Sequence, residues 1–73
     1  MKKYELLQDQ YIEVFGKRLF RIRALISFSF VNAGDIGGYI ESDKNLDVYG
    51  DAWVYDDAQV YGDALVYAFK LLS

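Results

Sequence analysis

Aspartates gather in a regular stretch between residues 48 and 67, and they are the side chains best suited to metal chemistry here. The four are Asp51, Asp56, Asp57 and Asp63. Several carboxylate oxygens could hold Ca²⁺. Residues 48–67, however, repeat with a period of six, with the sequence V-Y-G-D-A-x, and carry Asp where the chain is expected to turn. The β-helix repeat that binds Ca²⁺ is instead a nonapeptide with paired glycines. We therefore interpret the aspartates as turn-forming, solubilising residues and predict no metal site.

The tyrosines of the same stretch indicate a binding surface. They are Tyr49, Tyr55, Tyr61 and Tyr67, at the second repeat position, which we expect to point outward, and Trp53 lies between two copies. Tyr and Trp are enriched at the centres of interfaces. Carboxylates repeated beside them could imitate nucleic-acid phosphates and occupy a basic groove. Two other interpretations stay open: outward tyrosines that only stabilise neighbouring strands, and sugar binding.

No residue set predicts catalysis. The chain has no Cys and no His, so its serine and tyrosine hydroxyls lack a positioned base. The glycines of 32–41, "NAGDIGGYIE", are not followed by the Lys-Ser/Thr of a phosphate-binding loop. We interpret them as a loop or tight bend. The prediction is a protein without enzymatic activity and without a cofactor.

The unit V-Y-G-D-A-x recurs from residue 48, and its phase extends back to Ile36. Hexapeptide repeats are typical of solenoids, and three of them make one coil of a left-handed parallel β-helix. We expect the valine of position one and the small residue of position five to point inward. Gly or Asp at position three tolerates the left-handed backbone of a corner. In such a coil, residues 18 apart stack, which predicts Val48 under Val66 and Tyr49 under Tyr67.

The first half predicts a β-hairpin. The segments 11–15 and 19–25 alternate in polarity, and a loop at 16–18 would place Val14 opposite Phe20 and Ile12 opposite Ile22. Glu13 would then face Arg21, with Tyr11 opposite Arg23. The strand is expected to continue through 26–31. Residues 1–33 carry six basic and three acidic side chains (+3), and 34–73 carry two basic and eight acidic (−6).

The wording "LFRIRAL…GDIGGYIESDKNL…VYGDAWVYDDAQVYGDA" over residues 11–67 resembles a group of bacterial and phage hexapeptide-repeat proteins. That resemblance implies a small β cap followed by a left-handed β-helix. Longer members of the group are named transferases on repeat similarity alone. This chain departs from the pattern in its length, with two coils between 36 and 71, and in its tail, which reads Ala68-Phe69-Lys70.

The fold prediction is all-β in one domain, 1–73: a β-hairpin cap over 1–33, then a hexapeptide-repeat β-helix over 34–73 with an apolar tail. Two coils are few for a solenoid, so the apolar tail with Phe69, Leu71 and Leu72 should either cap the open coil or join two copies. We favour the second and predict a homodimer. We expect no signal peptide in "MKKYELLQDQ" and no membrane span, since no apolar run is long enough, and the absence of Cys fits the cytoplasm. The negative charge argues against direct nucleic-acid binding.

The function prediction is a non-catalytic protein-binding module. Its concrete version, by analogy with short phage and prophage proteins, is an acidic inhibitor of a host protein, such as a nucleic-acid-processing or defence protein. The candidate contact residues are Tyr49, Asp51, Trp53, Tyr55, Asp56, Asp57, Tyr61, Asp63 and Tyr67. The alternatives are a β-helix protein that assembles only with itself, and a shortened relic of a hexapeptide acyltransferase.

Overall fold

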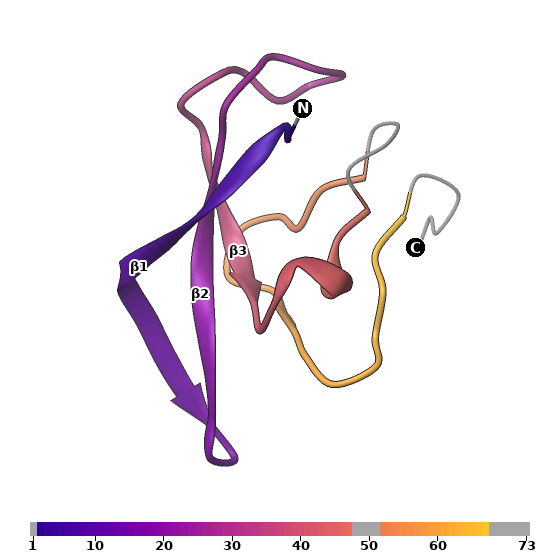
Figure 1. Ribbon diagram of the computed structural model, residues 1–73. Helices are drawn as coiled ribbons and strands as arrows, with labels where there is room; N and C mark the ends of the chain where they lie inside the picture. Colours follow the sequence, from indigo (N-terminus) through magenta and orange to yellow (C-terminus); the bar gives the residue numbers. More distant parts are fainter. Residues whose placement is uncertain (1, 48–51, 68–73) are drawn as a thin grey trace.

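Four β-strands make one open mixed sheet in a computed structural model that describes residues 2–47 and 52–67 (Figure 1). The strands are β1 (Tyr4–Val14), β2 (Lys17–Ala24), β3 (Ile36–Ile40) and β4 (Gln59–Val60), in the order β1-β2-β3-β4. A 3₁₀ turn, η1 (Asp43–Asn45), follows β3. The first two pairings are antiparallel, and β3 pairs with β4 in parallel. The all-β prediction is confirmed at this level.

The hairpin turn lies at Phe15 and Gly16, so the predicted loop at 16–18 is wrong. Both residues have positive φ, 51° and 78°, as a two-residue type I′ turn requires. Val14 therefore pairs with Lys17.

The register that follows corrects the predicted strand faces. Tyr11 pairs with Phe20, Ile12 with Leu19 and Glu13 with Arg18, so the predicted partners of Tyr11, Ile12 and Glu13 are wrong. Tyr11 with Phe20 and Ile12 with Leu19 are apolar pairs and Glu13 with Arg18 is a pair of opposite charge, which favours this register. An irregularity between Leu7 and Tyr11 then gives β1 three extra residues, 8–10. Simple alternation along the chain could not foresee that bulge.

Residues 26–31 do not continue the strand as predicted. Phe28 and Val31 instead exchange two backbone hydrogen bonds of 2.8 Å around a tight turn at Ser29 and Phe30. Ser29 has φ 49°, and the side chain of Phe30 is 92% exposed. This turn brings Phe28 and Val31 together, and Val31 lies in the core with Phe28 packed against it.

Residues 52–67 run alongside β3 and η1 and pair with them edge to edge, as Figure 1 shows for the orange and yellow chain. We call residues 52–67 the repeat layer, or second layer, and the segment from β3 to η1 the first layer. Tyr39 pairs with Gln59, Ile40 with Val60, and Leu46 bridges Val66, all in parallel. Each pair is 20 positions apart, so the predicted 18-residue stacking interval is wrong for the described residues. Tyr49, Val48 and the other residues of 48–51 and 68–73 lie outside the described part of the chain.

The core lies between the sheet and the segment 52–54. Its fully or nearly fully buried apolar side chains include Tyr4, Ile22, Ile40, Leu46, Ala52, Trp53 and Val54. The inward prediction for repeat position one is confirmed for Val54, while Val60 and Val66 are half-buried against the core. The inward prediction for position five holds at Ala52 but is wrong at Ala58 and Ala64, which are exposed. Ile36, the predicted start of the repeat phase, is 47% exposed.

Gly37 and Gly38 are buried within β3, which corrects their prediction as loop residues. A Cβ on Gly37 would lie 2.6 Å from the Val54 carbonyl oxygen, and one on Gly38 would lie 2.6 Å from the Ala58 carbonyl oxygen. These distances are far inside van der Waals contact. The two glycines therefore let the repeat layer approach β3 closely. Gly34, with φ 95°, does lie in the predicted loop.

Candidate functional site

The candidate site is a protruding corner of the repeat layer, residues 55–58, which we call the 55–58 corner. The N–H of Gly38 donates to Val54 O at 2.8 Å, whereas the N–H of the next residue, Tyr39, donates to Ala58 O at 2.9 Å. One step along β3 thus corresponds to four along the second layer. Residues 55–57 therefore have no counterpart along β3 and form a corner outside the ladder. The same excess explains why the stacking interval is longer than the repeat predicts.

All four residues of the 55–58 corner are exposed, and the Tyr55 side chain is 53% exposed. The N–H of Ala58 closes the turn on Tyr55 O at 3.0 Å. Asp56 has φ 52°, a backbone conformation that Asp adopts more readily than most residues. The corner therefore holds a tyrosine and two carboxylates on a closed turn.

Arg21 on β2 fixes this corner from across the sheet. Its guanidinium donates to Asp57 Oδ1 at 2.9 Å and to Asp56 O at 3.3 Å, and it lies 4.6 Å from the centre of the Tyr39 ring. The hydrogen bond to Asp57 raises the pKa of Arg21. The predicted Glu13–Arg21 pair is wrong, since Glu13 lies beside Arg18 instead. The only signal for this contact in the sequence was the division into a basic and an acidic half.

A second corner follows β4 at Gly62 and Asp63, and it is held from the first layer. Gly62 has φ 65°, so the predicted left-handed backbone at repeat position three is confirmed here and at Asp56. The N–H of Gly62 donates to Glu41 Oε1 at 2.8 Å, and this bond is the main cause that lowers the pKa of Glu41. Asp63 is exposed and Tyr61 is half-buried.

Asn45 fastens this second corner from inside, and sequence reasoning missed it. Its side chain is fully buried. Its Oδ1 accepts from the N–H of Glu41 at 3.2 Å and of Ser42 at 3.0 Å. Its Nδ2 donates to Gly62 O at 3.2 Å and Ala64 O at 2.7 Å. One amide thereby joins the two layers, and "SDKN" resembles too many ordinary turns to reveal that role.

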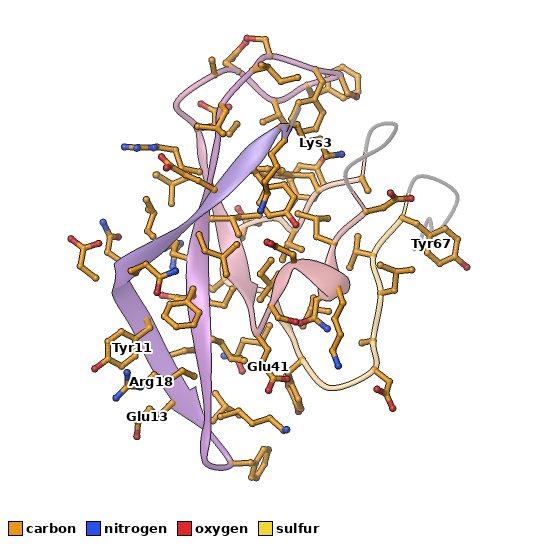
Figure 2. The ribbon with its side chains drawn as sticks, in the orientation of Figure 1. Lys3, Tyr11, Glu13, Arg18, Glu41 and Tyr67 are labelled. Atoms are coloured by element: carbon orange, nitrogen blue, oxygen red, sulfur yellow. The ribbon has the colours of Figure 1, made fainter. Side chains whose placement is uncertain are left out.

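The predicted contact and tail residues divide into four groups. Tyr55, Asp56 and Asp57 share the 55–58 corner. The second corner has the exposed Asp63, with the half-buried Tyr61 before it and Tyr67 (41% exposed, labelled in Figure 2) after it. Trp53 is wrong as a surface residue, because it is only 6% exposed and packs edge-on against Phe28 with ring centres 5.5 Å apart. The remaining predictions, Tyr49, Asp51, Phe69, Leu71 and Leu72, lie outside the described residues.

The basic residues of the first half are engaged within the chain. Lys2 pairs with Asp43 at 2.8 Å, Lys17 lies 3.6 Å from Glu41, and Arg23 pairs with Glu5. Lys3 is buried, donates to Ala52 O at 2.7 Å and lies over the Phe28 ring (Figure 2). Residues 55–67 carry three aspartates and no Lys or Arg, and the other 60 residues carry eight basic and eight acidic side chains. The whole net charge of −3 thus equals that of the 55–67 segment.

Among residues 2–47 and 52–67, no group of three or more acidic side chains is arranged to hold a metal ion. No helix in that part of the chain is long and apolar enough to cross a membrane. Compared with known proteins, the chain matches no protein-family model and no curated protein sequence. The physical character of the two corners is therefore the basis for a functional proposal.

Proposed function

We propose that this chain is a non-catalytic protein-binding module whose contact surface is the 55–58 corner together with Asp63 and Tyr67. One observation carries the proposal: an exposed tyrosine and two carboxylates stand out from the layer on a turn that Arg21 fixes from another strand. A held turn loses little conformational entropy on binding. Exposed tyrosine is a frequent energetic centre of protein interfaces.

The partner is a basic protein surface. The 55–67 segment carries −3 and has no positive side chain of its own. Asp57 already contacts Arg21, but its side chain remains 84% exposed, so it still presents an oxygen to solvent. The concrete version of the proposal is a phage-encoded inhibitor that acts in the cytoplasm on a host protein that binds nucleic acid. That version rests on the resemblance of the sequence.

We also propose that residues 36–67 are the beginning of a left-handed parallel β-helix. Parallel pairing of Ile40 with Val60 and of Leu46 with Val66 supports this, as does left-handed backbone at Asp56 and Gly62. In this architecture the side chains at corners face outward. The binding residues would then project from the rim of the coil.

The test compares corner variants by affinity capture from host lysate. Tyr55→Ala and Asp56→Asn leave the contact between Arg21 and Asp57 in place, and Asp9→Asn, in the exposed bulge of β1, is the matched control. We expect the wild type and Asp9→Asn to retain one basic, nucleic-acid-processing protein, and both corner variants to weaken that binding about tenfold, as loss of a central contact does. Equal retention by all four proteins would contradict the proposed surface.

Self-association is the second candidate. In a parallel ladder the backbone groups of alternate residues point to opposite sides. Val66 directs both of its groups to the first layer, so those of Leu65 face away from it. A second copy could pair there, with the predicted homodimer as the result. Light scattering of the purified chain distinguishes the two functions: a dimer that captures nothing but its own copies supports self-assembly and excludes the inhibitor.

A further inference from the structure

The turn of the β1–β2 hairpin displays Phe15 in an unfavourable setting. Its side chain is 87% exposed, and its φ is 51°. A bulky residue at positive φ is uncommon, and type I′ turns prefer Asn, Asp or Gly at this position. Exposing the ring gains nothing from the hydrophobic effect either. Phe15 is therefore a residue that the fold alone does not explain.

The arm that carries Phe15 is ordered to its end. β1 and β2 pair up to Val14 and Lys17, directly beside the turn. Behind it, the Tyr11 and Phe20 rings have centres 5.9 Å apart, and the Arg18 guanidinium lies 4.6 Å from the centre of the Tyr11 ring. Figure 2 shows Tyr11, Arg18 and Glu13 together along the outer side of this arm, and Figure 1 shows the turn at one extremity of the molecule. Because the strand pairing fixes the backbone up to the turn, Phe15 can bind with little backbone ordering cost.

Two loosely held cations flank the ring. Lys17 Nζ lies 3.6 Å from Glu41 Oε2, and Arg18 Nε lies 3.7 Å from Glu13 Oε2. Both separations exceed a hydrogen bond, and exposed ion pairs contribute little to stability. The two cations can therefore exchange these carboxylates for those of a partner at small cost. Arg and aromatic side chains are together the residues most enriched at energetic centres of interfaces.

We propose that the β1–β2 turn is a docking knob: Phe15 enters an apolar pocket of a partner protein, and Lys17 and Arg18 contact carboxylates on the rim of that pocket. The knob is independent of the 55–58 corner, because its charge has the opposite sign and it lies on other strands. A lipid surface is the weaker match, since even one acyl chain of fourteen carbons gives only marginal membrane binding.

The first test asks what Phe15 does for the fold. Phe15→Asn creates the Asn-Gly pair that a type I′ turn prefers. We expect its melting temperature to equal or exceed that of the wild type, because the fold gives up a strained, exposed ring. Phe30→Asn, at the exposed tip of the other tight turn, is the matched control. A clear fall in melting temperature for Phe15→Asn alone would assign Phe15 to the fold and overturn the proposal.

The second test maps what Phe15 touches. A photo-reactive benzoylphenylalanine is placed at position 15 or, as the control, at position 30 of the full chain in host lysate. We expect position 15 to cross-link one protein at an apolar segment beside Asp or Glu, with the yield falling at least fivefold in Lys17→Gln with Arg18→Gln. The proposal is overturned by cross-links to other copies of this chain alone, by equal yield from position 30, by insensitivity to the charge change, or by sedimentation with phosphatidylserine vesicles instead.

Discussion

The β1–β2 hairpin, which pairs antiparallel, and the repeat layer, which pairs in parallel with β3, are held together by different means. β1 has eleven residues and β2 has eight, so the hairpin has a long ladder with pairs such as Arg23 and Glu5 across it. β4 has two residues. Short strands of this kind provide little ladder, so the repeat layer depends on contacts at its corners and on close approach to β3.

The corner contacts place different demands on the sequence from those of a ladder. A ladder tolerates many substitutions, because each residue contributes a small share. The repeat layer is instead held at single positions: the Asn45 side chain bonds four backbone groups, and Gly38 makes room for the Ala58 carbonyl. We therefore expect the repeat half to be sensitive at single polar and glycine positions, whereas the hairpin should be sensitive only at its buried core side chains, such as Tyr4 and Ile22, and not at its exposed pairs.

The largest expected effect is that of Asn45→Ala. The change removes the partner of the Ser42 N–H and of the Gly62 and Ala64 carbonyls, whereas the Glu41 N–H keeps Val60 O at 3.1 Å. With about 1 kcal/mol for each of these three groups and about 1 kcal/mol for the cavity left by a fully buried side chain, the free energy of unfolding should fall by about 4 kcal/mol. Urea denaturation at pH 7 measures it. Asn32→Ala, at an exposed asparagine, is the control. A loss of stability in Asn45→Ala no greater than in that control would show that Asn45 does not hold the repeat layer.

The next effect is that of Gly38→Ala. The new Cβ would lie 2.6 Å from the Ala58 carbonyl oxygen and from Val54 Cγ1, so the repeat layer must shift away from β3. Overpacking of this kind should cost about 3 kcal/mol. Gly16→Ala is the counterpart in the hairpin: nothing lies within 4 Å, so only the positive φ of 78° opposes it, at about 1 kcal/mol. The same urea assay measures both variants. If Gly38→Ala and Gly16→Ala lost similar free energies of unfolding, close packing at glycine would not distinguish the repeat layer from the hairpin.

The sequence predicted what depends on local backbone preference. The left-handed corners at Asp56 and Gly62 were predicted, because the repeat marks that position with Gly or Asp. The hairpin was predicted but not its register, since the bulge at 8–10 leaves no local signal and a Phe at positive φ is against preference. Gly37 and Gly38 were assigned to a bend because their packing partners lie far along the chain.

The candidate site was predicted only in its exposed residues. The exposure of Tyr55, Asp56 and Asp57 is predicted by their positions in the repeat, because a residue that points outward can be identified without knowing its neighbours in the fold. Their protrusion comes from three extra residues of the repeat layer opposite a single step of β3, which a six-residue period does not predict. The prediction of Trp53 as a surface residue was wrong because its position in the repeat does not reveal that Phe28 packs against it. The partner predicted for Arg21 was wrong because its actual partner, Asp57, is 36 positions away.

The smallest effect joins the two halves and depends on pH. Tyr4 of β1 is fully buried, its hydroxyl lies 3.2 Å from Leu46 O and 3.4 Å from Asp43 Oδ1, and burial first and Asp43 second raise its pKa to about 12. The unfolded value is about 10. A pKa that is higher in the folded state gives stability that is complete below pH 10 and is lost as the pH rises towards 12.

Tyr4→Phe removes this titration. We therefore expect the difference in unfolding free energy between wild type and Tyr4→Phe to be constant from pH 7 to 9 and to shift by about 2 kcal/mol against the wild type by pH 11.5. Tyr55→Phe, at an exposed tyrosine, is the control variant. Guanidinium titrations of the three proteins at pH 8 and 11.5 measure it. A constant difference for Tyr4→Phe would mean that the hydroxyl reaches water, and that β1 is not closed over Leu46.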